Sequence, residues 1–296
     1  MSTTEDRVAD PAQDEAVIYE VTPTGVAVMT LNRPDRLNTW GGDIATSFYA
    51  GLDRAEQDPA VRVIVLTGRG KAFCAGAQLG SMGNLSQSIE TTDEGKLASL
   101  IGDRQPHHLT TLSKPVVAAI NGSCVGIGLT QALMCDVRFA AAGAKFAASF
   151  ARRGLIAEYG VSWILPRLTG WGVALDLLLS GRTFLADEAA ELGLVKAVVQ
   201  PEQLMAHAMA YAEDIAQNCS PASMAIIKRQ AYGDAMREVA DSSARSEILL
   251  HQSLKRPDVI EGITSFLEKR APRFPGLSAS AESSGTGKDD HGQPGL

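Results

Sequence analysis

Two short runs of apolar residues constrain the fold of this chain more than any other feature. VRVIVLTG at 61–68 and PVVAAI at 115–120 are nearly continuous in apolar, mostly β-branched residues. Runs of this kind are typical of strands buried on both faces, as in a parallel sheet covered by helices. Helical patterns alternate with the strands, and from Trp171 onward the chain is mainly helical. The pattern predicts an α/β core with a helical appendage.

Periodicity and turn residues predict the remaining elements. AVIYEV and VAVMTL, separated by TPTG, predict a β-hairpin, and residues 43–57 carry apolar residues at helical spacing. VRFAAAGAKFAA predicts another strand pair, LTQALMC a helix of small residues, and Pro201 and Pro221 each open a helix. We expect residues 80–112 to form a mobile loop and a helix over the site. The predicted organisation is a flexible arm (1–13), a core (14–200), a helical C-terminal region (201–275) and a disordered Gly- and Ser-rich tail (276–296).

Composition excludes several classes of protein. The chain has 296 residues, of which 45% are hydrophobic, and a net charge of −7. No apolar run approaches the ~20 residues of a membrane-spanning helix, and the acidic balance argues against binding nucleic-acid phosphates. The four cysteines lack C-x-x-C spacing, so no metal site is expected. The polar, acidic first twelve residues do not resemble a signal peptide, which predicts a cytoplasmic globular protein.

A glycine-rich segment follows each buried strand: GRGKAFCAGAQL at 68–79 and NGSCVGIGLTQ at 121–131. Glycine allows positive φ and lets backbone N–H groups approach a ligand, and a helix N-terminus favours a developing negative charge. Two such segments side by side could direct two N–H groups at one oxygen and form an oxyanion hole. Alternatively, both are tight turns that allow close packing. Neither segment has the third glycine of a dinucleotide-binding fingerprint.

Seven segments in sequence carry a resemblance to a known family: LNRPDRLNTW (31–40), VIVLTGRGKAFCAGAQL (63–79), KPVVAAINGSCVGIG (114–128), MCDVRFAAAGAKFA (134–147), LPRLTG (165–170), LLSGRTFLADEAAELGLVKAVV (178–199) and FLEKRAPRF (266–274). Together they resemble the crotonase (enoyl-CoA hydratase/isomerase) superfamily over about residues 16–275. The resemblance implies a spiral core of repeated ββα turns and a helical C-terminal region that mediates trimerisation, as a trimer or a hexamer. Members bind acyl-CoA thioesters and stabilise an enolate-like oxyanion with two backbone N–H groups. CoA enters as part of the substrate, so no separate cofactor is expected.

The resemblance assigns the two N–H groups to Ala77 and Ile127. The family usually has Gly where Ile127 stands and Asp where Gln78 stands. A β-branched residue still supplies its N–H, and it restricts the geometry around the acyl group. Further positions match residues that line CoA: Arg36, Leu37, Ala75, Gln78 and Leu79 along the channel, and Phe266 and Lys269 at the nucleotide end, often from a neighbouring subunit. Phe150 stands where the family's dehalogenase branch has an aromatic residue, and Trp40 is a candidate cap for the acyl pocket. Phe266 and Lys269 fit an ordinary terminal helix equally well, and Trp40 fits a core residue.

The residues for acid–base chemistry depart from the typical hydratase. That enzyme adds water with two glutamates, and the corresponding positions here hold Thr130 and Phe150, neither of which can carry a proton as a carboxylate does. Glu158 lies eight residues after Phe150, where the family's dehalogenase branch carries its catalytic Asp. An apolar pocket should raise the pKa of Glu158 and suit it to a single acid/base role. The alternative is a surface salt bridge to Arg152 or Arg153.

The sequence therefore predicts an acyl-CoA-processing lyase or isomerase with Ala77, Ile127 and Glu158 as its catalytic groups. Two alternatives remain open at this stage. One is a hydrolase of the same fold that cleaves a C–C bond in a cyclic diketone or a ring-derived CoA ester. The other is a non-catalytic binding module, which the residues at positions 130 and 150 suggest.

Overall fold

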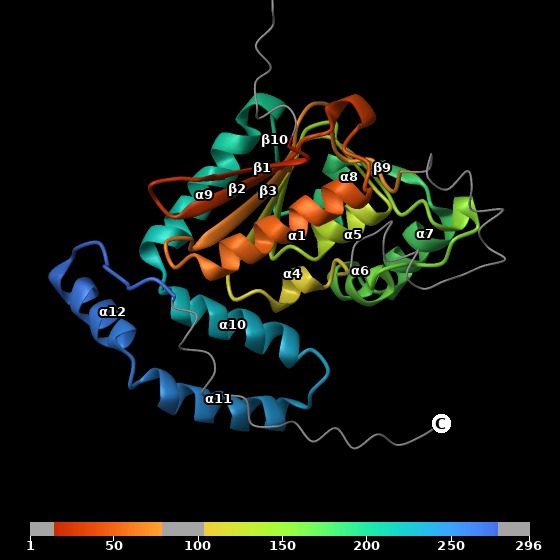
Figure 1. Ribbon diagram of the computed structural model, residues 1–296. Coiled ribbons are helices and arrows are strands. Elements are labelled where there is room, and N and C mark those ends of the chain that lie inside the picture. The colour runs from red at the N-terminus through yellow and green to blue at the C-terminus, as the bar shows by residue number, and fades with distance from the viewer. Residues whose placement is uncertain (1–14, 79–103, 278–296) are drawn as a thin grey trace, which may run out of the picture.

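The computed structural model describes residues 15–78 and 104–277 and contains two β-sheets surrounded by helices (Figure 1). The larger sheet has the strand order β1-β2-β3-β5-β7-β10. Its first two strands form the predicted antiparallel hairpin, and every later neighbour pairs in parallel. The strands of this sheet are β1 (Val17–Val21), β2 (Val26–Leu31), β3 (Val63–Gly68), β5 (Val116–Ile120), β7 (Val137–Ala141) and β10 (Ala197–Val199).

The smaller sheet is built from the strands that come next along the chain. Its order is β4-β6-β8-β9, with bounds Ala72–Cys74, Ser123–Val125, Lys145–Ala147 and Thr183–Leu185. The chain thus visits the two sheets in turn: β3 is followed by β4, β5 by β6, and β7 by β8. VRFAAAGAKFAA does form two strands, but they belong to different sheets and do not pair with each other.

Helices cover both faces of the larger sheet. α1 (Gly42–Gln57) lies on one face and α9 (Leu204–Asn218) on the other (Figure 1). The other helices in the described ranges are α4 (His108–Thr111), α5 (Ile127–Leu133), α6 (Val161–Thr169), α7 (Trp171–Ser180), α8 (Ala186–Glu191), α10 (Pro221–Gly233), α11 (Val239–Ser253) and α12 (Pro257–Glu268), with short 3₁₀ turns η2 (Pro34–Arg36), η5 (Ala151–Arg153) and η6 (Pro201–Gln203). None of the described helices is long and apolar enough to cross a membrane.

The run at 61–68 is buried on both faces, as its composition predicts. In β3, Ile64 and Leu66 pack in the core beneath α1, whereas Val63 and Val65 pack with Ala208 and other residues of α9. Alternate residues of a strand point to opposite faces, so the continuous apolar run fills two separate cores. α9 therefore belongs to the sheet's packing, and the proposed domain boundary at residue 200 stays a prediction.

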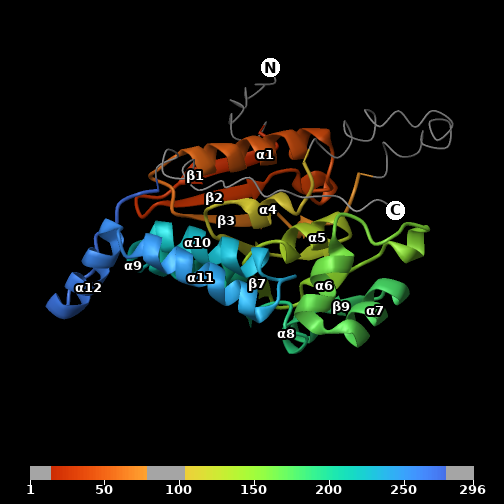
Figure 2. The same ribbon diagram turned by 90° about the horizontal axis from the view of Figure 1, so that it is seen from below.

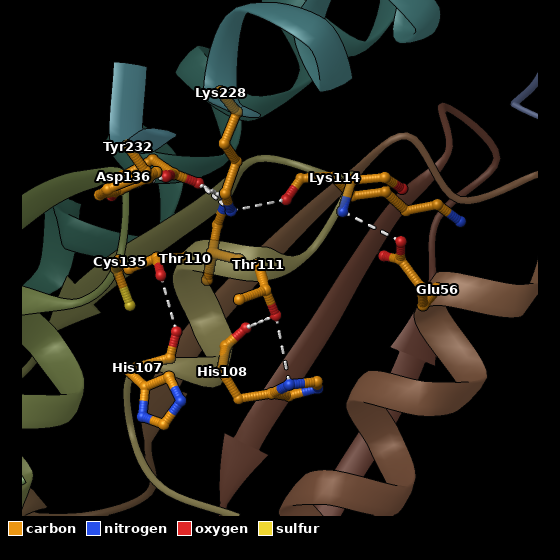
Figure 3. A network of polar contacts seen from close by, with 12 residues as sticks. Glu56, His107, His108, Thr110, Thr111, Lys114, Cys135, Asp136, Lys228 and Tyr232 are labelled. Atoms are coloured by element: carbon orange, nitrogen blue, oxygen red, sulfur yellow. Dashed lines mark hydrogen bonds and ion pairs between the residues drawn. The ribbon is translucent and has the colours of Figure 1, made fainter. Parts of the chain in front are cut away.

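An ion pair between the buried Lys228 and the partly buried Asp136 joins α10 to the start of β7 (Figure 3). Lys228 donates from Nζ to Asp136 at 2.7 Å and to the carbonyl of Lys114 at 3.1 Å. Asp136 also accepts from the Tyr232 hydroxyl at 3.0 Å and from the Val116 N–H at 2.7 Å. This single carboxylate therefore ties α10 to β5 as well as to β7.

The helices that follow α10 keep large apolar side chains in contact with solvent. α11 and α12 extend away from the sheets (Figures 1 and 2). Within the described chain, seven apolar residues of these helices and Leu254, directly after α11, are more than half exposed; the seven are Val239, Ile248, Leu250, Ile260, Ile263, Phe266 and Leu267. Each helix thus presents apolar surface that this one chain leaves uncovered.

The structure moves several predicted boundaries. The small-residue helix begins two residues earlier than LTQALMC, at Ile127. Pro201 opens a 3₁₀ turn that leads into α9, whereas Pro221 opens α10 directly. The helical last third also contains two short strands, β9 and β10. The expectation for residues 80–112 lies largely outside the described residues, and its described part contains α4.

Candidate active site

Parallel pairing of β4 with β6 brings the two glycine-rich segments together. Cys74 is the register partner of Cys124, so both strands end at the same edge of the smaller sheet. The segments stay in contact beyond the strands, because a Cβ on Gly126 would lie 3.9 Å from the Cα of Gly76. Gly76 has φ of 110° and Gly126 has φ of 55°, which L side chains rarely adopt. The glycines are therefore needed for the backbone geometry at this edge.

The backbone around Ala77 sets the direction of its N–H group. Trp40 donates its N–H to the carbonyl of Gly76 at 2.8 Å and accepts from the N–H of Gln78 at 2.9 Å. In a trans peptide the carbonyl and the following N–H point in opposite directions. Because the Gly76 carbonyl faces Trp40, the Ala77 N–H points away from that residue. The pairing with Trp40 thus holds this N–H at a fixed angle.

Ile127 is the first residue of α5, and its side chain is buried in the core. The first N–H groups of a helix have no acceptor within the helix. Gly126 before it donates to the carbonyl of Ala147 at 3.0 Å and accepts from the Thr130 N–H at 3.0 Å. These bonds fix the start of α5 against β8. The local geometry leaves the Ile127 N–H, with the partial positive charge of a helix start, at the same edge as Ala77.

The residues expected along CoA lie together beside Ala77. Arg36 donates to the Gln78 side chain at 3.0 Å, and Leu37 accepts from the Ala75 N–H at 3.1 Å. Arg36 also pairs with Asp43 at 2.5 Å. Leu37 adopts φ of 56° and is exposed. These contacts bring the Arg36 guanidinium, the Gln78 amide and the Leu37 side chain together at one rim of the candidate site, beside Ala77.

Three further expected residues are placed differently. Leu79 lies outside the described residues. Phe266 and Lys269 lie at the C-terminal end of α12, and α12 lies at the opposite end of the molecule from α5 and α6 (Figures 1 and 2). Phe266 is 82% exposed there. Within one chain, these two residues are not brought to the others.

Both positions of the usual hydratase glutamates are buried. Thr130 is fully buried, and its hydroxyl donates to the carbonyl of Gly126 at 3.3 Å. Phe150 is 5% exposed and belongs to the main core. The Thr130 hydroxyl thus stays within its own helix, and Phe150 adds an apolar wall.

Glu158 lies on the loop between η5 and α6 and is half-buried. Burial raises the pKa of this carboxyl above its ordinary value. Within the described chain it forms no salt bridge to Arg152 or Arg153, whose side chains donate to the carbonyls of Ser180 and Ser149. Tyr159 beside it has φ of 57°. Burial first, and then the neighbouring charge of Glu158, raise the pKa of Tyr159 to about 12.

Sequence reasoning missed a polar pair in the interior, Tyr49 on α1 and Gln131 on α5. Tyr49 packs edge-to-face with Trp40, with Phe48 and with His108. Burial raises the pKa of Tyr49 to about 12, and the Gln131 amide partly opposes that rise. The sequence signal was a glutamine in the middle of an otherwise apolar, small-residue helix. No group of His, Cys, Asp or Glu in the described ranges is arranged to hold a metal ion.

Comparison with known proteins agrees with this architecture. The family model for enoyl-CoA hydratase/isomerase matches residues 21–277. The chain is 35% identical over 253 residues to the 1,2-epoxyphenylacetyl-CoA isomerase of Escherichia coli K12, covering 85% of this chain and 95% of that one. It is 34% identical over 252 residues to the crotonyl-CoA hydratase of Syntrophomonas wolfei, covering 84% and 94%.

Solved structures give the same assignment. The crystal structure of an enoyl-CoA hydratase from Mycobacterium marinum is 67% identical, covers 76% of this chain and 100% of its own, and superposes with a TM-score of 0.64. The family match spans most of the described core and both glycine-rich segments. The chain therefore belongs to the enoyl-CoA hydratase/isomerase family, within the crotonase superfamily.

Proposed function

We propose that this protein is an enzyme that processes acyl-CoA thioesters through an enolate held by the N–H groups of Ala77 and Ile127. The observation that carries the proposal is the β4–β6 pairing, which aligns the two glycine-rich segments at one edge. The charge of a thioester enolate resides largely on one oxygen, and two fixed donors stabilise it as it forms. Loss of one such donor typically raises the barrier by about 2.7–4 kcal/mol.

Glu158 serves as the single acid/base in this proposal. Thr130 and Phe150 leave the usual glutamate positions without a carboxylate, so a two-glutamate hydration has no support. One half-buried carboxyl with a raised pKa suits removal of a proton from one carbon and its return to another. Isomerisation is therefore favoured over hydration. The relative from Escherichia coli is likewise named an isomerase.

The test is solvent deuterium exchange at the α- and γ-carbons across a panel of acyl-CoA thioesters. Glu158→Gln keeps the shape of the side chain and removes its basicity, so exchange should fall by orders of magnitude while CoA binds nearly as before. Glu191→Gln, at an exposed position on α8, is the matched control and should exchange at the wild-type rate. An unchanged exchange rate in Glu158→Gln would refute the role of Glu158 as the acid/base.

A CoA titration separates this proposal from the diketone hydrolase. Arg36, Leu37, Ala75 and Gln78 form the rim that would accept CoA, and micromolar binding is expected there. Absence of binding at millimolar CoA would favour a CoA-free reaction. No separate cofactor enters the proposal.

We further propose that the chain assembles as a trimer, alone or paired into a hexamer, through α11 and α12. The exposed apolar residues of these helices support it, since a monomer rarely leaves so much apolar surface uncovered. Phe266 and Lys269 would then reach the nucleotide end of CoA in a neighbouring subunit. Sedimentation equilibrium tests the proposal: a monomer at micromolar concentration contradicts it.

A further inference from the structure

Gln131 is buried without a hydrogen-bond partner. Gln131 is 2% exposed. Neither its amide nitrogen nor its amide oxygen forms a hydrogen bond with any group in the described part of the chain. A buried carboxamide in this condition is unfavourable unless something else satisfies it. The side chain stands on α5 four residues after Ile127, so it lies one turn inward from the proposed oxyanion hole on the same side of the helix.

The Tyr49 hydroxyl, which neighbours the Gln131 side chain, is also buried without a hydrogen-bond partner among the described residues. Tyr49 as a whole is 6% exposed. The effect of the Gln131 amide on this hydroxyl shows that the two groups are neighbours, although no bond of ordinary length and angle joins them. Two adjacent polar groups that do not satisfy each other leave donors and acceptors for a third group.

The position of this pair relates it to the proposed site. Tyr49 contacts Trp40, whose backbone pairs with Ala77, and Tyr159, the neighbour of Glu158, contributes to the raised pKa of Tyr49. Gln131 approaches from α5, whose first residue is Ile127. Both members of the pair thus adjoin elements that carry the proposed oxyanion donors: Tyr49 through Trp40, and Gln131 through α5.

The charge around the pair indicates which ligand it suits. The nearby cation, Arg104, lies over the Tyr49 ring. Both of its terminal nitrogens donate hydrogen bonds to the Asp53 carboxylate, at 2.5 and 2.7 Å. That carboxylate already balances the cation, so the pair offers no net positive charge to an anionic group. An amide and a phenol together match a neutral oxygen, which accepts from N–H or O–H and, as a hydroxyl, also donates.

We propose that the Gln131 carboxamide and the Tyr49 hydroxyl bind a neutral oxygen function, a hydroxyl or a keto group, on the acyl chain of the substrate. The inference rests on the proposed acyl-CoA function and narrows it to oxygenated acyl groups. A site built to hydrogen-bond an oxygen strongly rejects the analogue that lacks it, because its own buried groups are then left unpaired.

The experiment compares sets of CoA thioesters that differ only in one oxygen: a saturated acyl-CoA and its hydroxyacyl and ketoacyl counterparts. Calorimetric titration gives Kd, and deuterium exchange gives turnover, for the wild type and for Gln131→Leu and Tyr49→Phe. We expect the wild type to prefer an oxygenated ester by at least tenfold. Each substitution should reduce that preference to within about threefold. Gln203→Leu, exposed on η6, is the control and should keep the wild-type preference.

Stability supplies a readout that does not depend on the ligand. Replacing an unpaired buried amide by an apolar side chain of similar size should leave Tm unchanged or raise it. A clear fall in Tm for Gln131→Leu would show that the amide is satisfied within the native fold and would overturn the inference. Binding of CoA esters without an oxygen preference would overturn it as well and leave the proposed function standing. Absence of binding to every CoA ester would instead overturn the proposed function.

Discussion

Gly128 provides the sharpest test of how the two glycine-rich segments are held together. It lies in the first turn of α5, directly against β4. A Cβ at this position would stand 2.3 Å from the carbonyl oxygen of Cys74 and 2.7 Å from the Cβ of Cys74. Backbone atoms of a paired strand cannot rotate away as the end of a long side chain can. Gly128→Ala therefore has to push α5 and β4 apart.

The required movement follows from these distances. Ordinary contacts of a Cβ begin at 3.4 Å, so the clash is relieved only when helix and strand separate by about 1 Å. Overpacking of this kind costs about 1–3 kcal/mol, or roughly 2–12 °C in Tm for a domain of this size. The same shift changes the spacing of the Ala77 and Ile127 N–H groups. A misplacement of about 1 Å in a catalytic site lowers turnover by about 10²-fold.

The assays are thermal unfolding at fixed protein concentration and deuterium exchange on the best acyl-CoA of the panel. Gly172→Ala is the control, because a Cβ on Gly172 of α7 would meet no atom within 4 Å. Alanine there should leave exchange unchanged and stabilise the helix by up to about 1 kcal/mol. Wild-type exchange in a Gly128→Ala protein of wild-type Tm would refute the close packing of α5 on β4, and with it the geometry of the proposed hole.

Three charged residues, Lys228, Glu158 and Arg36, have separate effects on stability, exchange and CoA binding. Lys228→Met removes the cation from the partly buried carboxylate of Asp136 and should lower the free energy of unfolding by about 1.5–3 kcal/mol in urea titrations, the contribution of a hydrogen bond to a charged group; a loss below about 1 kcal/mol would contradict the anchoring role of the pair. Burial raises the pKa of Glu158 above its ordinary 4.5, so exchange should rise with pH through that raised value as the base ionises. Over the same window stability should fall with rising pH, because the folded state binds this proton more tightly than the unfolded one, and Glu158→Gln should abolish both dependences. Arg36→Ala should weaken CoA binding about tenfold, the loss of one charge-assisted hydrogen bond (~1.4 kcal/mol), in calorimetric titrations; an unchanged Kd would place CoA away from the Gln78 rim.

Local pattern was sufficient for the strands and helices that fill the core. The run at 61–68 is continuous because each face of β3 packs on a different helix, and this double burial is visible in composition alone. The division of VRFAAAGAKFAA between two sheets was not predictable. Its two strands look alike in sequence, and only long-range pairing with β5 and β6 decides where each one goes.

The candidate site shows the same limit. The glycines mark both segments at the sequence level, because their backbone angles exclude most side chains. The sequence around Tyr49 does not indicate a functional role for this residue. It follows Phe48 in an amphipathic helix and fits the edge of that helix's apolar face. Gln131 is a polar residue in a mostly apolar helix, and this much is visible in the sequence. Whether its side chain has a hydrogen-bond partner depends on Tyr49, which belongs to another helix. Relations between elements far apart in the chain have no local signature.

The pairing of β4 with β6 also bears on how the protein folds. Cys74 and Cys124 are register partners, yet the chain between them includes β5 and α4. Contacts with such long sequence separation require closure of the intervening loop, which lowers the entropy of the chain, and they therefore slow folding. The donors of the proposed hole, Ala77 and Ile127, follow β4 and β6 respectively, so the hole forms only when these two strands have paired. During refolding, recovery of deuterium exchange should therefore trail the recovery of helical circular dichroism, and catalytic competence would mark the last non-local step of folding.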